Sequence, residues 1–187
     1  MSFTPSAQPS LAAGGLSAAA AGTPIATIPP LLVSSLVTVP AQSLVAFLAT
    51  AGASVTLSTL GTYLHTAGVT PGAGVNRLAI YSAAGALLAQ TADMTAAMQA
   101  AGLCEGALTA PVPVQAGTNY YLAMLDNFTG TSPQTIGFAG QALNSSAAPM
   151  FGGLLPNLFT GGQASMPASF TPGSLGAGGS VNYIYGR

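Results

Sequence analysis

The chain has 187 residues, of which 50% are hydrophobic and only 3% are charged, whereas an ordinary soluble domain carries about 25% charged residues. Its two basic residues, Arg77 and Arg187, cannot form the positive patch that phosphate neutralisation requires, so we expect no nucleic-acid partner. One histidine and one cysteine, His65 and Cys104, are too few for a structural zinc site or an intramolecular disulfide.

The first 30 residues form a segment of their own. Residues 1–30 are rich in Ala, Ser, Pro and Gly and show no sustained hydrophobic period. Such a segment has too few apolar side chains to pack on itself, so we expect an extended arm that is ordered only by something else. It lacks the positive residues that open a secretory signal peptide. Prolines and polar residues interrupt the apolar stretches here and beyond, so we also expect no membrane-spanning helix.

From residue 31 the pattern changes to short strands separated by turn residues. Ala83-Ala84-Gly85 predicts the tight turn of a β-hairpin, and residues 66–76 (TAGVTPGAGVN) predict a loop rich in Gly and Pro. A longer loop is expected over residues 147–179. The predicted strands are Leu31–Val39, Leu44–Ala49, Ser54–Leu60, Arg77–Ser82, Ala86–Gln90, Leu103–Leu108, Pro111–Val114, Tyr120–Leu125, Thr135–Ala142 and Val181–Tyr185.

One short helix is predicted among these strands. Asp93 can cap the helix Met94–Ala101 by accepting backbone N–H bonds, and Gly102 can close it. The residues at helical spacing on its expected buried face are Met94, Ala97, Met98 and Ala101.

The spacing of strands and turns is typical of an all-β fold. Turn signals recur every 8–12 residues or so, which favours a jelly-roll-like β-sandwich over alternating βαβ units. We therefore expect an extended arm over residues 1–30 and a single β-sandwich domain with one short helix over residues 31–187.

Few residues could carry catalysis. His65 is the sole imidazole, and the chain lacks the G-x-S-x-G motif that presents a nucleophilic serine. A glycoside hydrolase would need two of the three acids, Asp93, Glu105 and Asp126, at one bond, which the sequence neither demands nor forbids. We expect no catalytic, cofactor or metal site and, by elimination, a non-enzymatic structural or binding protein.

The turn from Asp126 to Gly130 is a candidate binding feature. A single carboxylate supplies too little negative charge for calcium, and Asx-turn hydrogen bonding explains the turn without any ligand. Sugar recognition through Tyr120, Asp126 and Asn127 stays open. Cys104 is expected to be a small buried hydrophobic residue.

The segment from Asn76 to Asn127 contains a series of short motifs, which are Ala79-Ile80-Tyr81, Gly85-Ala86-Leu87-Leu88-Ala89, Thr91 with Asp93, Thr95-Ala96-Ala97, Ala101-Gly102, Ala107-Leu108-Thr109-Ala110-Pro111, Ala116-Gly117-Thr118 and Tyr120-Tyr121. In these motifs the segment resembles a β-sandwich module of virion proteins of tailed phages that infect actinobacteria, found in minor tail, fibre and decoration proteins. A second similar stretch is SMPASFTPGSL, residues 165–175.

The resemblance implies a jelly-roll-like domain exposed on a virion, with other virion proteins as partners and a homo-oligomer, a trimer by analogy. A minor tail, tail-tip or fibre protein that contacts a glycan or lipid of the host surface is the first expectation. A capsid decoration protein is the second. A free carbohydrate-binding module and a hydrolase remain as alternatives from other classes.

Overall fold

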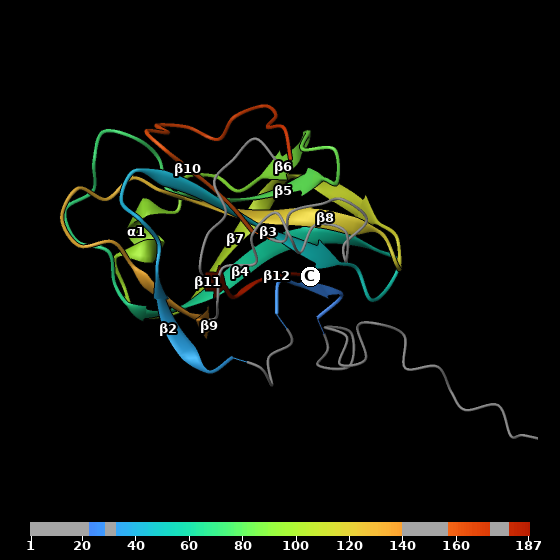
Figure 1. The fold of residues 1–187 in the computed structure, drawn as a ribbon, viewed down its shortest axis with the longest axis horizontal. Coiled ribbons are helices and arrows are strands. Elements are labelled where there is room, and N and C mark those ends of the chain that lie inside the picture. The colour runs from blue at the N-terminus through green and yellow to red at the C-terminus, as the bar shows by residue number, and fades with distance from the viewer. Residues whose placement is uncertain (1–22, 29–32, 140–156, 173–179) are drawn as a thin grey trace, which may run out of the picture.

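Two antiparallel β-sheets packed face to face dominate the structure (Figure 1). The computed structural model describes residues 23–28, 33–139, 157–172 and 180–187. The two sheets and the one short helix of the described residues confirm the all-β sandwich that the sequence predicts. Most of the expected arm, residues 1–22 and 29–30, lies outside the described residues, as do parts of the expected 147–179 loop.

The larger sheet is organised around one long strand, β4, which pairs with β7, β9 and β12. The edge strand β1 pairs with β12, and β9 also pairs with β2 and β11. The strands of this sheet are β1 (Ile25–Ala26), β2 (Ser35–Thr38), β4 (Val55–Thr66), β7 (Gly102–Val114), β9 (Gln134–Ala139), β11 (Ser180–Asn182) and β12 (Ile184–Gly186).

The smaller sheet has the order β10-β3-β8-β5-β6. Its strands are β3 (Ser43–Thr50), β5 (Arg77–Ser82), β6 (Leu87–Gln90), β8 (Asn119–Asp126) and β10 (Asn157–Gly161). The β5–β6 hairpin predicted from Ala83-Ala84-Gly85 is present, with Gly85 at φ 82°, a conformation that glycine adopts without a Cβ clash.

The main core fills the space between the two sheets. Alternate residues of each strand point inward, as the two-residue period of a β-strand requires. The large buried side chains in this layer include Phe47, Leu57, Leu60, Leu64, Leu78, Ile80, Leu122, Met124, Phe128 and Ile184.

The smaller sheet is buried on its second face as well. Leu44, Ala79, Tyr121 and Leu125 form a separate cluster there with Met166. Burial on both faces explains why β3 and β8 read as continuous apolar runs without alternation. The segment Ala164–Pro172 runs over this face, and we call it the strap.

Several strand boundaries differ from the sequence prediction. β4 continues to Thr66, beyond the predicted end at Leu60. The two predicted segments of residues 103–108 and 111–114 form one strand, β7, whose pairing shifts register opposite Leu57 and Thr59. Ile25 and Ala26, placed in the arm by the sequence, form β1 and are buried in the sandwich.

The helix is shorter than predicted. α1 spans Thr95–Met98, and Ala97 and Ala101 are exposed, so the expected four-residue buried face is reduced to Met94 and Met98. The cause is tertiary, because the carbonyl of Met98 accepts a hydrogen bond from the amide of Gly68 at 2.9 Å. Gly102, at φ 119°, then starts β7.

Candidate functional site

The outer face of the larger sheet carries the most distinctive group of surface side chains in the described structure. Residues two apart on a strand share a face, so Tyr63 lies on the same side of β4 as Gly61, and Leu103 on the same side of β7 as Glu105. Tyr63 and Leu103 are direct partners in the β4–β7 pairing. Strand β2 adds Leu36, which is paired with Ile136 of β9. We call this surface the outer face; its members are Leu36, Tyr63, Leu103, Glu105, Ile136, Tyr183, Tyr185 and Arg187.

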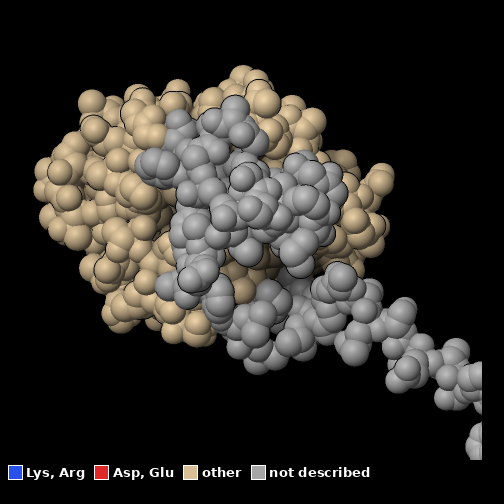
Figure 2. Space-filling model, in the orientation of Figure 1, with Lys and Arg blue, Asp and Glu red and all other residues tan. Residues whose placement is uncertain are grey.

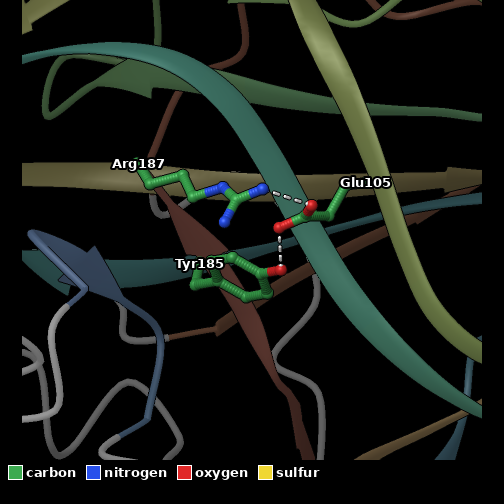
Figure 3. A network of polar contacts seen from close by, with 3 residues as sticks. All are labelled: Glu105, Tyr185 and Arg187. Atoms are coloured by element: carbon green, nitrogen blue, oxygen red, sulfur yellow. Dashed lines mark hydrogen bonds and ion pairs between the residues drawn. The ribbon is translucent and has the colours of Figure 1, made fainter.

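Three polar side chains meet on the outer face (Figure 3). The hydroxyl of Tyr185 donates a hydrogen bond to Oε1 of Glu105. Nη2 of Arg187 lies 2.6 Å from Oε2 of the same carboxylate, so each oxygen of Glu105 has its own donor. Burial raises the pKa of Tyr185 well above its usual range, and the bond to Glu105 and the charge of that carboxylate raise it further.

The backbone fixes this network across three strands. Gly61 is the register partner of both Tyr185 on β12 and Glu105 on β7. A Cβ atom on Gly61 would lie 2.5 Å from Cζ of Tyr185 and 2.9 Å from Cγ of Glu105. The absence of a side chain at Gly61 therefore lets the tyrosine ring cross β4 and reach the carboxylate on the far strand.

The rest of the outer face is apolar and partly open to solvent. Tyr183 and Tyr185 are buried, with ring centroids 5.6 Å apart, and they pack with Ile136. In contrast, Leu36 is 48% exposed, Tyr63 43% and Leu103 65%. Exposed apolar side chains that are gathered on one face of a sheet are typical of surfaces that meet another molecule.

The turn after β8 has a structural role. Oδ1 of Asp126 accepts the amide of Phe128 at 2.9 Å, which is the Asx turn that the sequence predicts. Asn127 is held by Asn76, whose Oδ1 accepts the Asn127 amide at 2.7 Å, and by the carbonyl of Val75 at 2.7 Å. These bonds tie the turn to the glycine-rich 66–76 loop.

The three residues predicted as glycan contacts are therefore not arranged as a surface site. Tyr120, Asp126 and Asn127 are 7%, 0% and 4% exposed. The Tyr120 hydroxyl accepts the amide of Gln115 at 3.1 Å, near the opposite end of β8 from Asp126. The structure brings Asp126 and Asn127 together but leaves Tyr120 apart, so it gives no support to a binding site made of these three.

Asp126 is the one deeply buried acid. Burial raises the pKa of Asp126, while hydrogen bonds from Ser132 and the Phe128 amide lower it in part. Its Oδ2 has no hydrogen-bond partner among the described residues. The carboxyl group thus stands in an environment that disfavours its charged form.

The other predicted residues lie in separate places. Asp93 accepts bonds from the amides of Asn76 and Thr95 and from the Thr95 hydroxyl, the last at 2.6 Å. Each of the three acids thus has its own hydrogen-bond partners. Cys104 is buried in the main core, as expected, and burial raises its pKa to about 11. His65 is exposed at the end of β4.

No local sequence pattern predicts the outer face. Glu105 and Tyr185 are 80 residues apart, and Glu105 and Arg187 are 82 apart, so no local spacing links them. One signal was present in the composition. The whole chain has two basic and three acidic residues, so few pairs of residues could form an ion pair.

Comparisons with known proteins do not identify the chain. No protein-family model matches it, and a search of curated proteins finds no match either. Within the described residues, no three His, Cys, Asp or Glu side chains gather as metal ligands would. The same part of the chain contains no helix with the length and apolar character needed to cross a membrane.

Proposed function

We propose that this chain is a non-enzymatic structural protein of a tailed-phage virion, with a minor tail, tail-tip or fibre position favoured. The observation that carries the proposal is the combination of a nearly uncharged chain with an exposed apolar sheet face. Leu36, Tyr63 and Leu103 are open to solvent on one sheet, and the chain has a net charge of −1. Such a surface promotes association when it is left free.

In the orientation of Figure 2, the described residues show neither blue nor red. A permanently assembled subunit can carry such a surface because other subunits cover it. The resemblance of residues 76–127 to phage virion modules agrees with this reading.

A capsid decoration protein is the alternative that shares this observation. Both roles use a sandwich domain with a face buried against other subunits, and they differ in copy number and position. Decoration requires scores to hundreds of copies, whereas a tail tip requires few. Host contact through a glycan or lipid belongs to the tail proposal.

Gold labelling tests position. Gold-labelled antibody against the full chain is applied to purified phage particles, and the gold grains are located by electron microscopy. Grains at the tail or its tip support the favoured position. Grains over the head support decoration, and unlabelled intact particles contradict both positions.

A further inference from the structure

The outer face carries most of the large hydrophobic side chains that are exposed among the described residues. Five large hydrophobic side chains are exposed in the described part of the chain, and Leu36, Tyr63 and Leu103 are three of them. The other two, Val69 and Leu88, lie on a loop and on β6 of the smaller sheet. Among the described residues, most of the exposed large hydrophobic side chains therefore lie on one face of the larger sheet.

That surface also carries one charge of each sign. Arg187 is paired with Glu105, and the side chain of Arg187 is still 60% exposed while that of Glu105 is 21% exposed. A guanidinium has five N–H donors, and the bond to Glu105 uses Nη2. In Figure 3 one nitrogen of the Arg187 guanidinium is joined to the carboxylate, and the other nitrogens carry further donors for an acceptor on another molecule.

The remaining charges do not compete with this pair. Asp126 is buried. Asp93 accepts hydrogen bonds from Asn76 and Thr95. The outer face thus has a small apolar surface with a positive and a negative group side by side.

A surface with both signs is complementary to itself. When two copies meet across a two-fold axis, each residue of one copy can face a different residue of the other. Arg187 of each copy can then approach Glu105 of the second copy, which joins two ion pairs into one alternating network. The apolar contacts of Tyr63 and Leu103 are buried around it.

We propose that the outer face is a docking surface for a second copy of this chain, in a two-fold pairing centred on Glu105 and Arg187. The inference deepens the proposed function and rests on it, because pairing of copies is one way to cover this face within a particle. It differs from the three-fold arrangement implied by the resemblance, since a self-complementary face favours an even-numbered assembly.

The test uses sedimentation equilibrium of the full chain. It compares two matched variants, each of which replaces one exposed apolar residue with glutamate. Leu103→Glu places a charge on the outer face, and Val69→Glu places the same charge on a loop position that is 53% exposed, compared with 65% for Leu103. We expect wild type and Val69→Glu to sediment at twice the monomer mass. Leu103→Glu should raise the dissociation constant by at least about tenfold, since each 1.4 kcal/mol is tenfold in affinity. Circular dichroism of each variant checks that the sandwich is intact.

A charge reversal supplies the second arm. Arg187→Glu puts two carboxylates together in each copy, and it should weaken pairing. A mixture of Arg187→Glu with Glu105→Arg should pair better than either variant alone, because each variant then supplies the charge opposite to that of the other. Equal weakening by Leu103→Glu and Val69→Glu would overturn the choice of face.

A monomeric wild type at all concentrations tested would overturn the pairing itself. If that monomer binds a glycan array and Tyr63→Ser abolishes the binding, the occupant of the face is a glycan instead. Neither outcome bears on whether the chain is present in virions, so the inference and the proposed function can fail separately.

Discussion

The ring of Tyr185 lies across Gly61 and donates its hydroxyl hydrogen to Glu105 on the strand beyond. This relationship joins β12, β4 and β7, three strands that come from distant parts of the chain. It depends on a position without a side chain in the middle of β4, which pairs with both other strands. The outer face is built on that arrangement, because it sets the places of Glu105 and Arg187.

Gly61→Ala should destabilise the fold. The new Cβ would lie 2.5 Å from Cζ of Tyr185, and such overpacking typically costs about 1–3 kcal/mol. Urea unfolding measures the free energy. In a Tyr185→Ala background the same substitution should cost less, because the ring that blocks the methyl group is gone. An equal cost in both backgrounds would contradict the close approach.

Asp126→Asn should change how stability depends on pH. Burial raises the pKa of Asp126 in the folded state above an unfolded value of about 3.9. The folded state therefore holds that proton more tightly, and its contribution to the free energy of unfolding falls as pH rises above about 4. The asparagine keeps the Oδ1 acceptor for the Phe128 amide and does not titrate.

The measurement is urea unfolding of wild type and Asp126→Asn between pH 4 and pH 7. We expect the variant to lose the fall in stability and to be at least as stable as wild type at pH 7. Parallel profiles for the two proteins would show that Asp126 is no more costly to ionise in the folded chain than in the unfolded one.

Asp93→Asn should change the pH dependence of stability with the opposite sign to Asp126→Asn, and the change should occur at lower pH. Burial tends to raise the pKa of Asp93, but hydrogen bonds from Thr95 and Asn76 and the charge of Arg77 outweigh it, so the pKa is lowered. Stabilisation by the carboxylate is present above about pH 4 and is lost as pH falls through the folded-state pKa. Wild type should thus exceed the variant at pH 6, with the difference shrinking toward pH 3. A constant difference over that range would argue against the titration of Asp93 as its source.

Phe170→Ala should loosen the strap from the smaller sheet. The Phe170 ring lies 4.9 Å from that of Tyr81 and 5.3 Å from that of Tyr121, centroid to centroid. Phe170 is half-buried, so we expect a loss of about 2 kcal/mol, below the range for a fully buried phenylalanine.

Ser169→Ala is the matched control for the strap, because the exposed Ser169 takes part through its backbone bridge to Ala86. It should unfold at nearly the same urea concentration as wild type. Limited proteolysis should cut the strap of Phe170→Ala sooner. If both variants behaved alike, the aromatic contacts would not be what holds the strap.

The sequence predicted features that depend on neighbours along the chain. The β5–β6 hairpin follows from Gly85 between two alternating segments, and the Asx turn follows from the chemistry of Asp126 itself. Where the prediction was wrong, contacts between distant segments decided the outcome. The Met98 carbonyl, which ends α1, accepts a hydrogen bond from the Gly68 amide, and β4 continues through Gly61, which pairs with Tyr185 and Glu105 on the two neighbouring strands.

The candidate site could not be predicted from neighbouring residues either, because contacts between distant segments form it. Tyr120, Asp126 and Asn127 are close to each other in sequence and polar, but the fold buries them. Tyr63, Glu105 and Arg187 are far apart in sequence, and only the pairing of β4 with β7 and β12 places them on one face. Their residue types carry no motif.

The most direct test of the proposed function is quantitative mass spectrometry of purified particles, with the major capsid protein as the internal standard. We predict that the chain is an integral component present in few copies per particle, and that it remains after washing in high salt. Hundreds of copies would place it on the capsid shell. Its absence from intact particles would contradict the virion role.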